Sequence, residues 1–397
     1  MPADSPLKAR AYLDHAATTA LRPEAREAFL QASSVLGNPG SVHTAGRRAR
    51  AVLDDALAQI AEDLGIPRSW IVLTSGGTEA DNLALRGVSQ AVLAADPQRN
   101  TVAVAATDHA ATAETATQIG EGVQGRILPV ADSGLLRMDA VREALASGDV
   151  SLVSVALANN ETGVVQDLAA VASIAREHGT LVHTDAVQGL GHTELPSFDD
   201  VDLMSLTAHK IGGPVGIGAL VVKPEVTLRP MATGGGQQRG LRSGTLDAAH
   251  TAAFAAALHS TLEDWQAEMQ RLGGLAQQIR EGIRAIDPSA QFTVPAGTPH
   301  TEHIVHVMFP GADSESLLFL LDERGVDCSA GSACHAGVTG GSHVLTAMGV
   351  EPQLARGSLR LSLGWTSSPQ DVEILLQALP EALTRSRAVA AFTGLGH

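Results

Sequence analysis

The chain has 397 residues, of which 44% are hydrophobic and 18% are charged, so it is expected to fold and is long enough for two domains. Its formal net charge is −16, and no run of Lys or Arg forms a basic stripe, so nucleic acid is not an expected partner. Only two cysteines occur, Cys328 and Cys334, which excludes a disulfide framework, and no metal site is predicted.

No segment has the pattern of a targeting or membrane-spanning element. Residues 1–10 are polar and lack the apolar core of a signal peptide. The apolar runs, such as Val150–Ala158, are far shorter than a bilayer span. We therefore expect a cytoplasmic protein without a membrane partner.

In chain order, short β-rich runs alternate with helical patterns from about Arg68 onward. The runs predict strands at Trp70–Thr74, Thr101–Ala106, Gly125–Val130, Val150–Leu157, Thr180–Thr184, Val201–Leu206 and Ile217–Val222. Helical patterns such as Thr78–Leu93 and Leu168–His178 lie between them. The strands are apolar throughout rather than alternating, which is typical of strands covered on both faces. The sequence therefore predicts an α/β unit with a mostly parallel sheet.

The pattern changes near Leu246. An Ala- and Gln-rich helical stretch is predicted to about Ile286, with a break at Gly273–Gly274. The remaining pattern predicts strand, helix, strand and helix at His303–Phe309, Ser314–Arg324, Gly357–Leu363 and Pro369–Ala388. We interpret this region as a smaller α+β domain with the long helix as its connector.

Lys210 ends an apolar strand and enters a turn rich in Gly and Pro, where α/β sheets expose ligand-binding side chains. A lone lysine of this kind is more often solvated, but Asp185 ends another strand upstream. A pyridoxal ring needs an anion beside its nitrogen, and Asp185 suits that role, while Gln188 can donate to the phenolate oxygen. An aspartate there is more often a helix cap, yet its pairing with Lys210 favours a pyridoxal phosphate (PLP) site with Lys210 as the Schiff-base lysine.

Three further strand ends carry polar groups that would meet at the same edge of the sheet. Ser75–Thr78 places two glycines before a helix, where Gly77, Thr78 and free N–H groups can receive phosphate, and no nucleotide-loop ending follows. Ser205 and His209 are predicted as further phosphate contacts. His109 can stack on the cofactor ring and move protons, and Asn159–Gly163 forms another polar cluster.

These motifs resemble the cysteine desulfurases of the class V aminotransferase family along nearly the whole chain. The matching segments are Tyr12–Thr19, Gly37–His43, Thr74–Glu79, Asn159–Gly163, His183–Asp185, Ala208–Lys210, Gly234–Gln237, Leu241–Thr245, Ser329–Cys334 and Leu359–Ser362. The Gly-Ser-Ala-Cys and Arg-Ser-Gly-Thr segments are the most specific of them.

The resemblance implies the type I fold of PLP-dependent transferases, with a large domain built on a mostly parallel seven-stranded sheet. It places the large domain at residues 13–250 and the smaller one at 1–12 with 251–397. The connector helix then spans about 246–286, and a catalytic cysteine loop spans 329–342.

The resemblance also implies a reaction: L-cysteine gives L-alanine, and its sulfur passes to Cys334 as a persulfide. Lys210 takes the α-proton, and His109 stacks on the ring and shuttles protons. The remaining implied contacts are Arg360, Asn159 and Asn38 for the substrate, Thr78, Ser205, His209 and Thr245 for the phosphate, and Asn159 for the cofactor. Thr245 would reach the phosphate of a neighbouring subunit, which implies a homodimer.

Cys334 rather than Cys328 is predicted as the nucleophile. Cys328 follows a probable strand and suits a small core residue. Cys334 precedes a Gly-rich stretch, Gly337–Gly341, and a nucleophile that collects and delivers sulfur needs such a tether. The segment is similar to the longer-loop branch of the family, which implies an acceptor such as an iron–sulfur scaffold or a tRNA-thiolation enzyme. Asp108, Gln238 and Gly40 depart from the usual family residues without removing a chemical role.

Three alternatives stay open at this point. An aminotransferase or lyase of the same fold would use Lys210 and Asp185 but not Cys334. A selenocysteine lyase would differ in preferring selenium. A degenerate relative would serve only as a binding scaffold, although the intact lysine, aspartate, arginine and cysteine argue against it.

Overall fold

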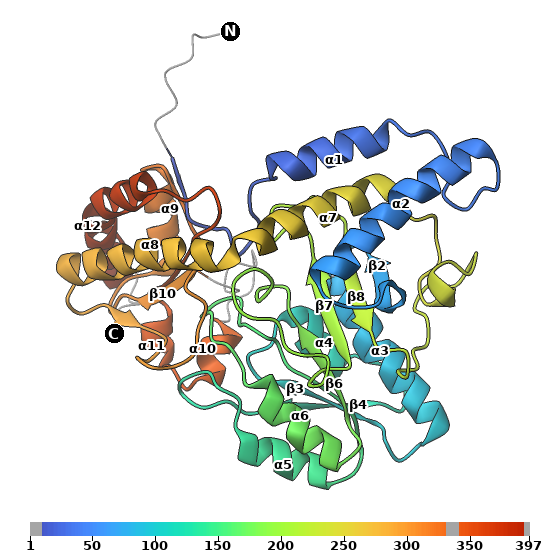
Figure 1. The fold of residues 1–397 in the computed structure, drawn as a ribbon. Helices are drawn as coiled ribbons and strands as arrows, with labels where there is room; N and C mark the ends of the chain where they lie inside the picture. Colours follow the sequence, from blue (N-terminus) through green and yellow to red (C-terminus); the bar gives the residue numbers. More distant parts are fainter. Residues whose placement is uncertain (1–9, 331–340, 393–397) are drawn as a thin grey trace.

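The computed structural model describes residues 10–330 and 341–392, which fold around three sheets (Figure 1). The largest sheet has seven strands, in the spatial order β2 (Ile71–Thr74), β8 (Gly218–Val222), β7 (Leu203–Thr207), β6 (Leu181–Asp185), β5 (Val150–Ser154), β3 (Thr101–Ala105) and β4 (Gln124–Leu128). Only β8 runs antiparallel to its neighbours, so the predicted mostly parallel sheet is confirmed.

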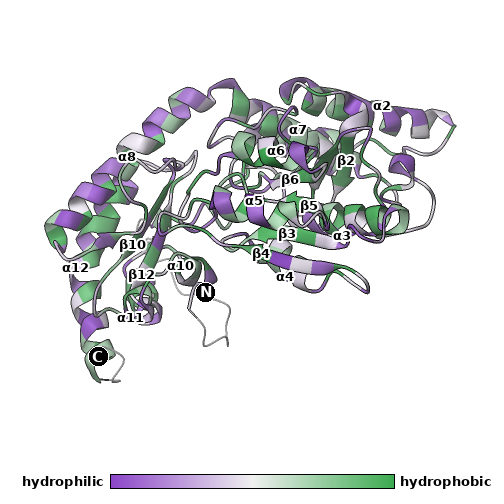
Figure 2. Cartoon of the chain, turned by 90° about the horizontal axis from the view of Figure 1, so that it is seen from below, coloured by the Kyte–Doolittle hydropathy of each residue, from purple (hydrophilic) through white to green (hydrophobic). Residues whose placement is uncertain are grey.

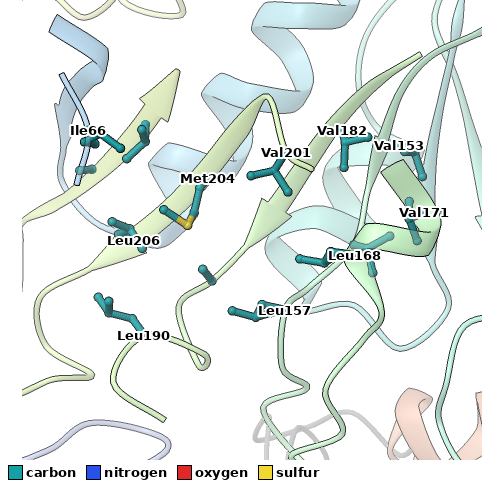
Figure 3. Close-up of a cluster of buried hydrophobic side chains, with 14 of the residues drawn as sticks. Ile66, Val153, Leu157, Leu168, Val171, Val182, Leu190, Val201, Met204 and Leu206 are labelled. Atoms are coloured by element: carbon teal, nitrogen blue, oxygen red, sulfur yellow. The ribbon is translucent and has the colours of Figure 1, made fainter. Parts of the chain in front are cut away.

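Helices cover both faces of this sheet, which explains the continuous apolarity of its strands. Val102 and Val104 of β3 belong to the cluster beneath α3 (Gly77–Ala95) and α4 (Ala110–Thr117). Alternate residues, such as Ala103, point to the opposite face and join a larger cluster. The helices of that face are α2 (Thr44–Asp63), α5 (Met138–Ala146), α6 (Leu168–Glu177) and α7 (Ala248–Glu263). Figure 3 shows Val182 and Met204 of the sheet in this cluster with Leu168 and Val171 of α6.

A second, smaller unit lies beside the large sheet (Figures 1 and 2). Its antiparallel sheet has the order β12 (Ser358–Ser362), β10 (Ile304–Met308) and β9 (Gln291–Phe292), and β1 (Ala11–Tyr12) pairs in parallel with β11 (Val326–Asp327). The remaining helices are α1 (Pro23–Ser33), α8 (Trp265–Ile286), α9 (Ser314–Asp322), α10 (His343–Ala347), α11 (Pro352–Ala355) and α12 (Pro369–Phe392), with 3₁₀ turns at Arg68–Trp70 and Gln238–Gly240. Among the described helices, none combines the length and apolarity that a membrane crossing requires.

The predicted break at Gly273–Gly274 is wrong, because α8 continues through both glycines. Its buried stripe, which includes Leu272 and Leu275 on either side of them, packs on the smaller sheet. Each glycine costs the helix about 1 kcal/mol relative to alanine, a penalty that this burial outweighs. The chain bends instead at Asp264 (φ −127°, ψ 23°), and the buried residues of α7 belong to the large-sheet cluster.

The segment after β1 passes from the smaller unit to the large one. Asp14 forms a β-bridge with Ser362 of β12. A few residues later, the Thr19 N–H donates to the His209 carbonyl and the Arg22 N–H to the Gly212 carbonyl. This N-terminal segment, residues 11–22, therefore lies against the turn that contains Lys210.

Candidate active site

A cavity of about 710 Å³ opens where the parallel strands end and the two units meet. The predicted site residues that line it are Gly77, Thr78, His109, Asp185, Gln188, His209, Lys210 and Arg360. These residues come from α3, the loop after β3, the ends of β6 and β7, and β12. Most of the predicted site residues therefore lie together at the carboxyl ends of the strands.

The glycine turn leaves the start of α3 open toward the cavity. Gly76 has φ 151°, which side chains rarely adopt, and it caps α3 without a side-chain hydrogen bond. A Cβ atom on Gly77 would stand 2.7 Å from Cγ2 of Val187, so only glycine fits there. The first N–H groups of α3 and the exposed Thr78 are thus available to an anion.

The Lys210 amine points to the N-terminal segment at the edge of the cavity. Nζ donates to the Ala16 carbonyl at 2.5 Å and to the Ala17 carbonyl at 2.7 Å. Burial, followed by the positive charge of Arg360, lowers the pKa of Lys210 to about 8. Roughly a tenth of the amine is therefore neutral, and hence nucleophilic, at pH 7, far more than for an ordinary lysine.

Asp185 is the last residue of β6, and Gln188 lies in the turn that follows this strand. Burial raises the pKa of the Asp185 carboxyl, which has no basic residue bonded to it among the described residues and accepts the Val187 N–H at 2.9 Å. A cation placed beside Asp185 would reverse this shift. The Gln188 amide donates to the Ala16 carbonyl at 2.7 Å, which fixes its direction.

His109 lies at the start of α4 with its ring exposed to the cavity. Its Nδ1 accepts the Ala111 N–H at 3.1 Å, so the neutral ring carries its proton on Nε2. The surrounding protein lowers the pKa of His109 through desolvation, which favours this neutral form. His209, whose pKa burial lowers to about 4, has Nδ1 at 3.2 Å from the Thr18 hydroxyl.

Arg360 is 5% exposed and is held by two partners. Nη2 donates to Asp14 at 2.8 Å and Nη1 to the Asn160 carbonyl at 2.8 Å, while Nε is buried without a partner among the described residues. An arginine has five N–H donors, so three remain for a carboxylate.

Four predicted residues are not brought to the cavity lining. The Ser205 hydroxyl lies 2.9 Å from His183 Nε2 inside the sheet, and the Asn159 side chain is used within its own turn, where it accepts the Thr162 N–H at 2.8 Å. Asn38 accepts the Gly40 N–H at 2.8 Å, and Thr245 is exposed elsewhere. The phosphate assignment of Ser205 is therefore wrong for this chain. Cys334 lies outside the described residues.

Four residues at or beside the cavity were not predicted as site residues from the sequence: Thr207, Asp81, Asn160 and Asp14. Thr207 is the last residue of β7, and its hydroxyl would be 3.7 Å from a Cβ on Gly76, so it lies beside the glycine turn. The signal was available, because Thr207 stands nearer the strand end than Ser205. Asp81 lines the cavity from inside α3, where an acidic residue gives no such signal.

These residues fit pyridoxal phosphate on physical grounds. An uncapped helix start with a glycine cradle suits the phosphate. A buried carboxyl whose raised pKa a cation would relieve suits the ring nitrogen, and a lysine of lowered pKa suits the aldehyde.

Comparison with known proteins yields matches over nearly the whole chain. The profile of the family described as aminotransferase class-V matches residues 11–375. An IscS-like cysteine desulfurase from Mycobacterium tuberculosis is 41% identical over 384 residues, which cover 96% of this chain and 98% of that protein. A solved NifS-like protein has a TM-score of 0.87 at 30% identity, covering 95% of this chain and 100% of its own. The structure of SspA in complex with cysteine has a TM-score of 0.76 at 28% identity, covering 90% and 100%.

Proposed function

This chain belongs to the class V aminotransferase family, and from that premise we propose that it is a PLP-dependent cysteine desulfurase that converts L-cysteine to L-alanine. The observation that carries the proposal is one cavity in which Lys210, Asp185 and Arg360 meet the open start of α3. The similar proteins named cysteine desulfurase, and a similar structure that contains cysteine, support the choice of substrate.

The cofactor would be held at three points. The start of α3, with Gly77, Thr78, Thr207 and His209, holds the phosphate. Asp185, as the anion, would accept a hydrogen bond from the protonated ring nitrogen, and the Lys210 amine would hold the aldehyde carbon. When bound, pyridoxal phosphate supplies an electron sink for the bonds to the substrate α-carbon.

The substrate would be oriented by charge. Arg360 binds the α-carboxylate with the donors that Asp14 and the Asn160 carbonyl leave free. Lys210 lines the same cavity, and its neutral amine would accept the α-proton at Nζ and later return it. His109 carries its proton on Nε2 in the same cavity and donates it to a developing anion.

Cys334 would accept the sulfur. Its thiolate would form a bond to the substrate sulfur as the bond from Cβ to sulfur breaks. The electron pair of the broken bond stays with Cβ, which takes up a proton to give alanine, and the sulfur remains on Cys334 as a persulfide. Ser329 and Gly341, on either side of residues 331–340, both line the cavity, so the chain enters and leaves this segment at the site. The persulfide then passes its sulfur to an acceptor protein, such as an iron–sulfur scaffold or a tRNA-thiolation enzyme.

We further propose a homodimer in which Thr245 contacts the phosphate bound by the neighbouring subunit. Two features support this arrangement: Thr245 is exposed, and it does not line the cavity of its own chain.

The test measures alanine and sulfide released from L-cysteine under reductant, with purified protein reconstituted with pyridoxal phosphate. Cys334→Ser is expected to bind the cofactor with an unchanged visible absorbance band and to release no sulfide. Cys328→Ser is the matched control, because Cys328 is half-buried against the smaller core, and it should retain turnover. Normal turnover by Cys334→Ser would contradict the proposal.

A further inference from the structure

Asp81 is a buried carboxyl beside the cofactor cavity that the mechanism above does not use. It lies on the first turns of α3, is 1% exposed and contributes to the cavity lining. Its Oδ1 atom has no hydrogen-bond partner among the described residues. Such an atom is costly unless a ligand or a proton satisfies it.

The side chains that face Asp81 come from the two central strands. Residues 183 and 185 of β6, and residues 205 and 207 of β7, alternate with core residues of the other face and so point toward α3. His183 Nε2 is 3.7 Å from Asp81 Oδ1 and 2.9 Å from the Ser205 hydroxyl, and its Nδ1 is 2.8 Å from Ser154. Burial lowers the pKa of His183 to about 3, so this ring is neutral and offers Asp81 no positive charge.

The charged groups near Asp81 are acidic. Burial, followed by the like charges of Asp185 and Asp108, raises the pKa of the Asp81 carboxyl well above its ordinary value, although the Ser205 hydroxyl acts in the opposite direction. None of the described residues forms a salt bridge to Asp81 from a lysine or arginine. Two ionised carboxylates in one dry pocket repel strongly, so the pair lowers its free energy by sharing one proton.

When the cofactor is bound, its charge would determine which of the two carboxyls, Asp81 or Asp185, is protonated. The ring nitrogen would carry a proton directed at Asp185, which stabilises Asp185 as the anion. Asp81 lies deeper, beside the neutral His183 and Ser205, and gains no cation. We propose that Asp81 and Asp185 form a two-carboxyl pair with a single negative charge. In this pair Asp81 stays a neutral acid, and its O–H group donates a hydrogen bond toward the ionised Asp185 and so positions it. This inference rests on the proposed function.

The test compares the same substitution at the two carboxyls, with pyridoxal phosphate affinity as the readout. Asp81→Asn keeps a neutral donor, so its Kd for pyridoxal phosphate should stay within about threefold of wild type. Asp185→Asn removes the charge, and Asp81→Ala removes the donor to a charged group, so each should weaken binding by about tenfold or more. Circular dichroism and thermal unfolding confirm that each variant folds.

An infrared difference spectrum of wild-type and Asp81→Asn holoenzyme provides a second readout that a merely structural role would not move. Wild type should show the carbonyl stretch of a protonated carboxylic acid, and the variant should lack it. The proposal is overturned if Asp81→Asn weakens binding as much as Asp185→Asn, or if wild type lacks that band. Failure of wild type itself to bind pyridoxal phosphate would instead overturn the proposed function.

Discussion

At the level of single residues, we expect the side chains around the glycine turn to determine how tightly the proposed phosphate is held. Thr207 is buried at the end of β7 and lines the cavity beside Gly76 and Gly77. Among the described residues, its hydroxyl makes only a long contact, 3.4 Å, with the Ile217 carbonyl, so it is available to bond an anion.

Thr207→Val should therefore weaken pyridoxal phosphate binding by about tenfold, because a hydrogen bond to a charged group contributes about 1.5 kcal/mol or more. The measurement is the dissociation constant of the cofactor. Thr184→Val is the matched control, since Thr184 lies on the other face of β6 with a buried hydroxyl that has no partner among the described residues. Equal effects of the two variants would contradict the assignment of Thr207.

Single residues could be predicted where a strand end marked them. Lys210 and Asp185 each end or closely follow a strand, and both reach the cavity. Ser205 and Thr207 lie on the same face of β7, so the alternation of side chains along the strand could not show which of them reaches the cavity. Only their distance from the end of the strand distinguishes them. Asp81 could not be found because a helical acid one turn from a loop has the pattern of an exposed residue.

At the level of elements, two glycines of α8 differ in their packing, so the same substitution should change the stability of the protein in opposite directions. Nothing lies within 4 Å of a Cβ built on Gly274, whereas a Cβ on Gly282 would stand 2.4 Å from Leu376 of α12. Both positions lie within the same 22-residue helix.

Gly274→Ala should raise the free energy of unfolding by about 0.5–1 kcal/mol, because alanine restricts the unfolded chain and favours the helix. Gly282→Ala in the same helix should instead destabilise the protein, because its methyl group overlaps Leu376. Urea unfolding of the two variants measures both effects. A destabilised Gly274→Ala would mean that α8 is not continuous there.

The connector could be predicted as helical but not where it bends. Gly-Gly is a common helix breaker, and the sequence pattern alone gives it more weight than Asp264. Tertiary burial of Leu272 and Leu275 overrides that preference, and it involves strands that come later in the chain.

For the molecule as a whole, a stacked histidine pair is expected to make the stability of the fold decrease in acid. His192 and His303 have ring centroids 3.6 Å apart at an angle of 11°. His303 is buried and His192 is half-buried, and neither ring nitrogen of His303 has a partner among the described residues. Burial lowers the pKa of His192 to about 3 and that of His303 well below its ordinary value. Below about pH 6.5 the unfolded chain therefore takes up protons first, and stability falls as the pH drops toward 3.

His303→Leu should reduce the slope of the free energy of unfolding against pH. The reduction is at most that of one proton, or about 1.4 kcal/mol per pH unit. Urea unfolding between pH 7 and pH 4.5 measures the slope. His259→Leu is the opposite case. Asp63 raises the pKa of His259, so His259 adds stability as the pH falls, and removing His259 should make the loss of stability in acid steeper. An unchanged slope in His303→Leu would show that the pair is protonated in the folded protein.

The whole architecture could be predicted largely because its signals are local. Apolar runs bounded by glycine and polar residues mark the strands of the large sheet within a few residues. The pairing of β1 with β11 joins residues at opposite ends of the chain, and no local pattern indicates it.

That pairing has a consequence for how the protein is made. The segment at residues 11–22 leaves the ribosome early, yet Arg360, which bonds Asp14, is 346 positions further along the chain. The carbonyls that hold the Lys210 amine belong to the same segment. A nascent chain can therefore fold its large sheet during translation, but its reactive centre is completed only after Arg360 has been synthesised. Until then, Asp14 lacks both its arginine partner and its β-bridge to Ser362, so the segment that holds the lysine is not yet tied to β12.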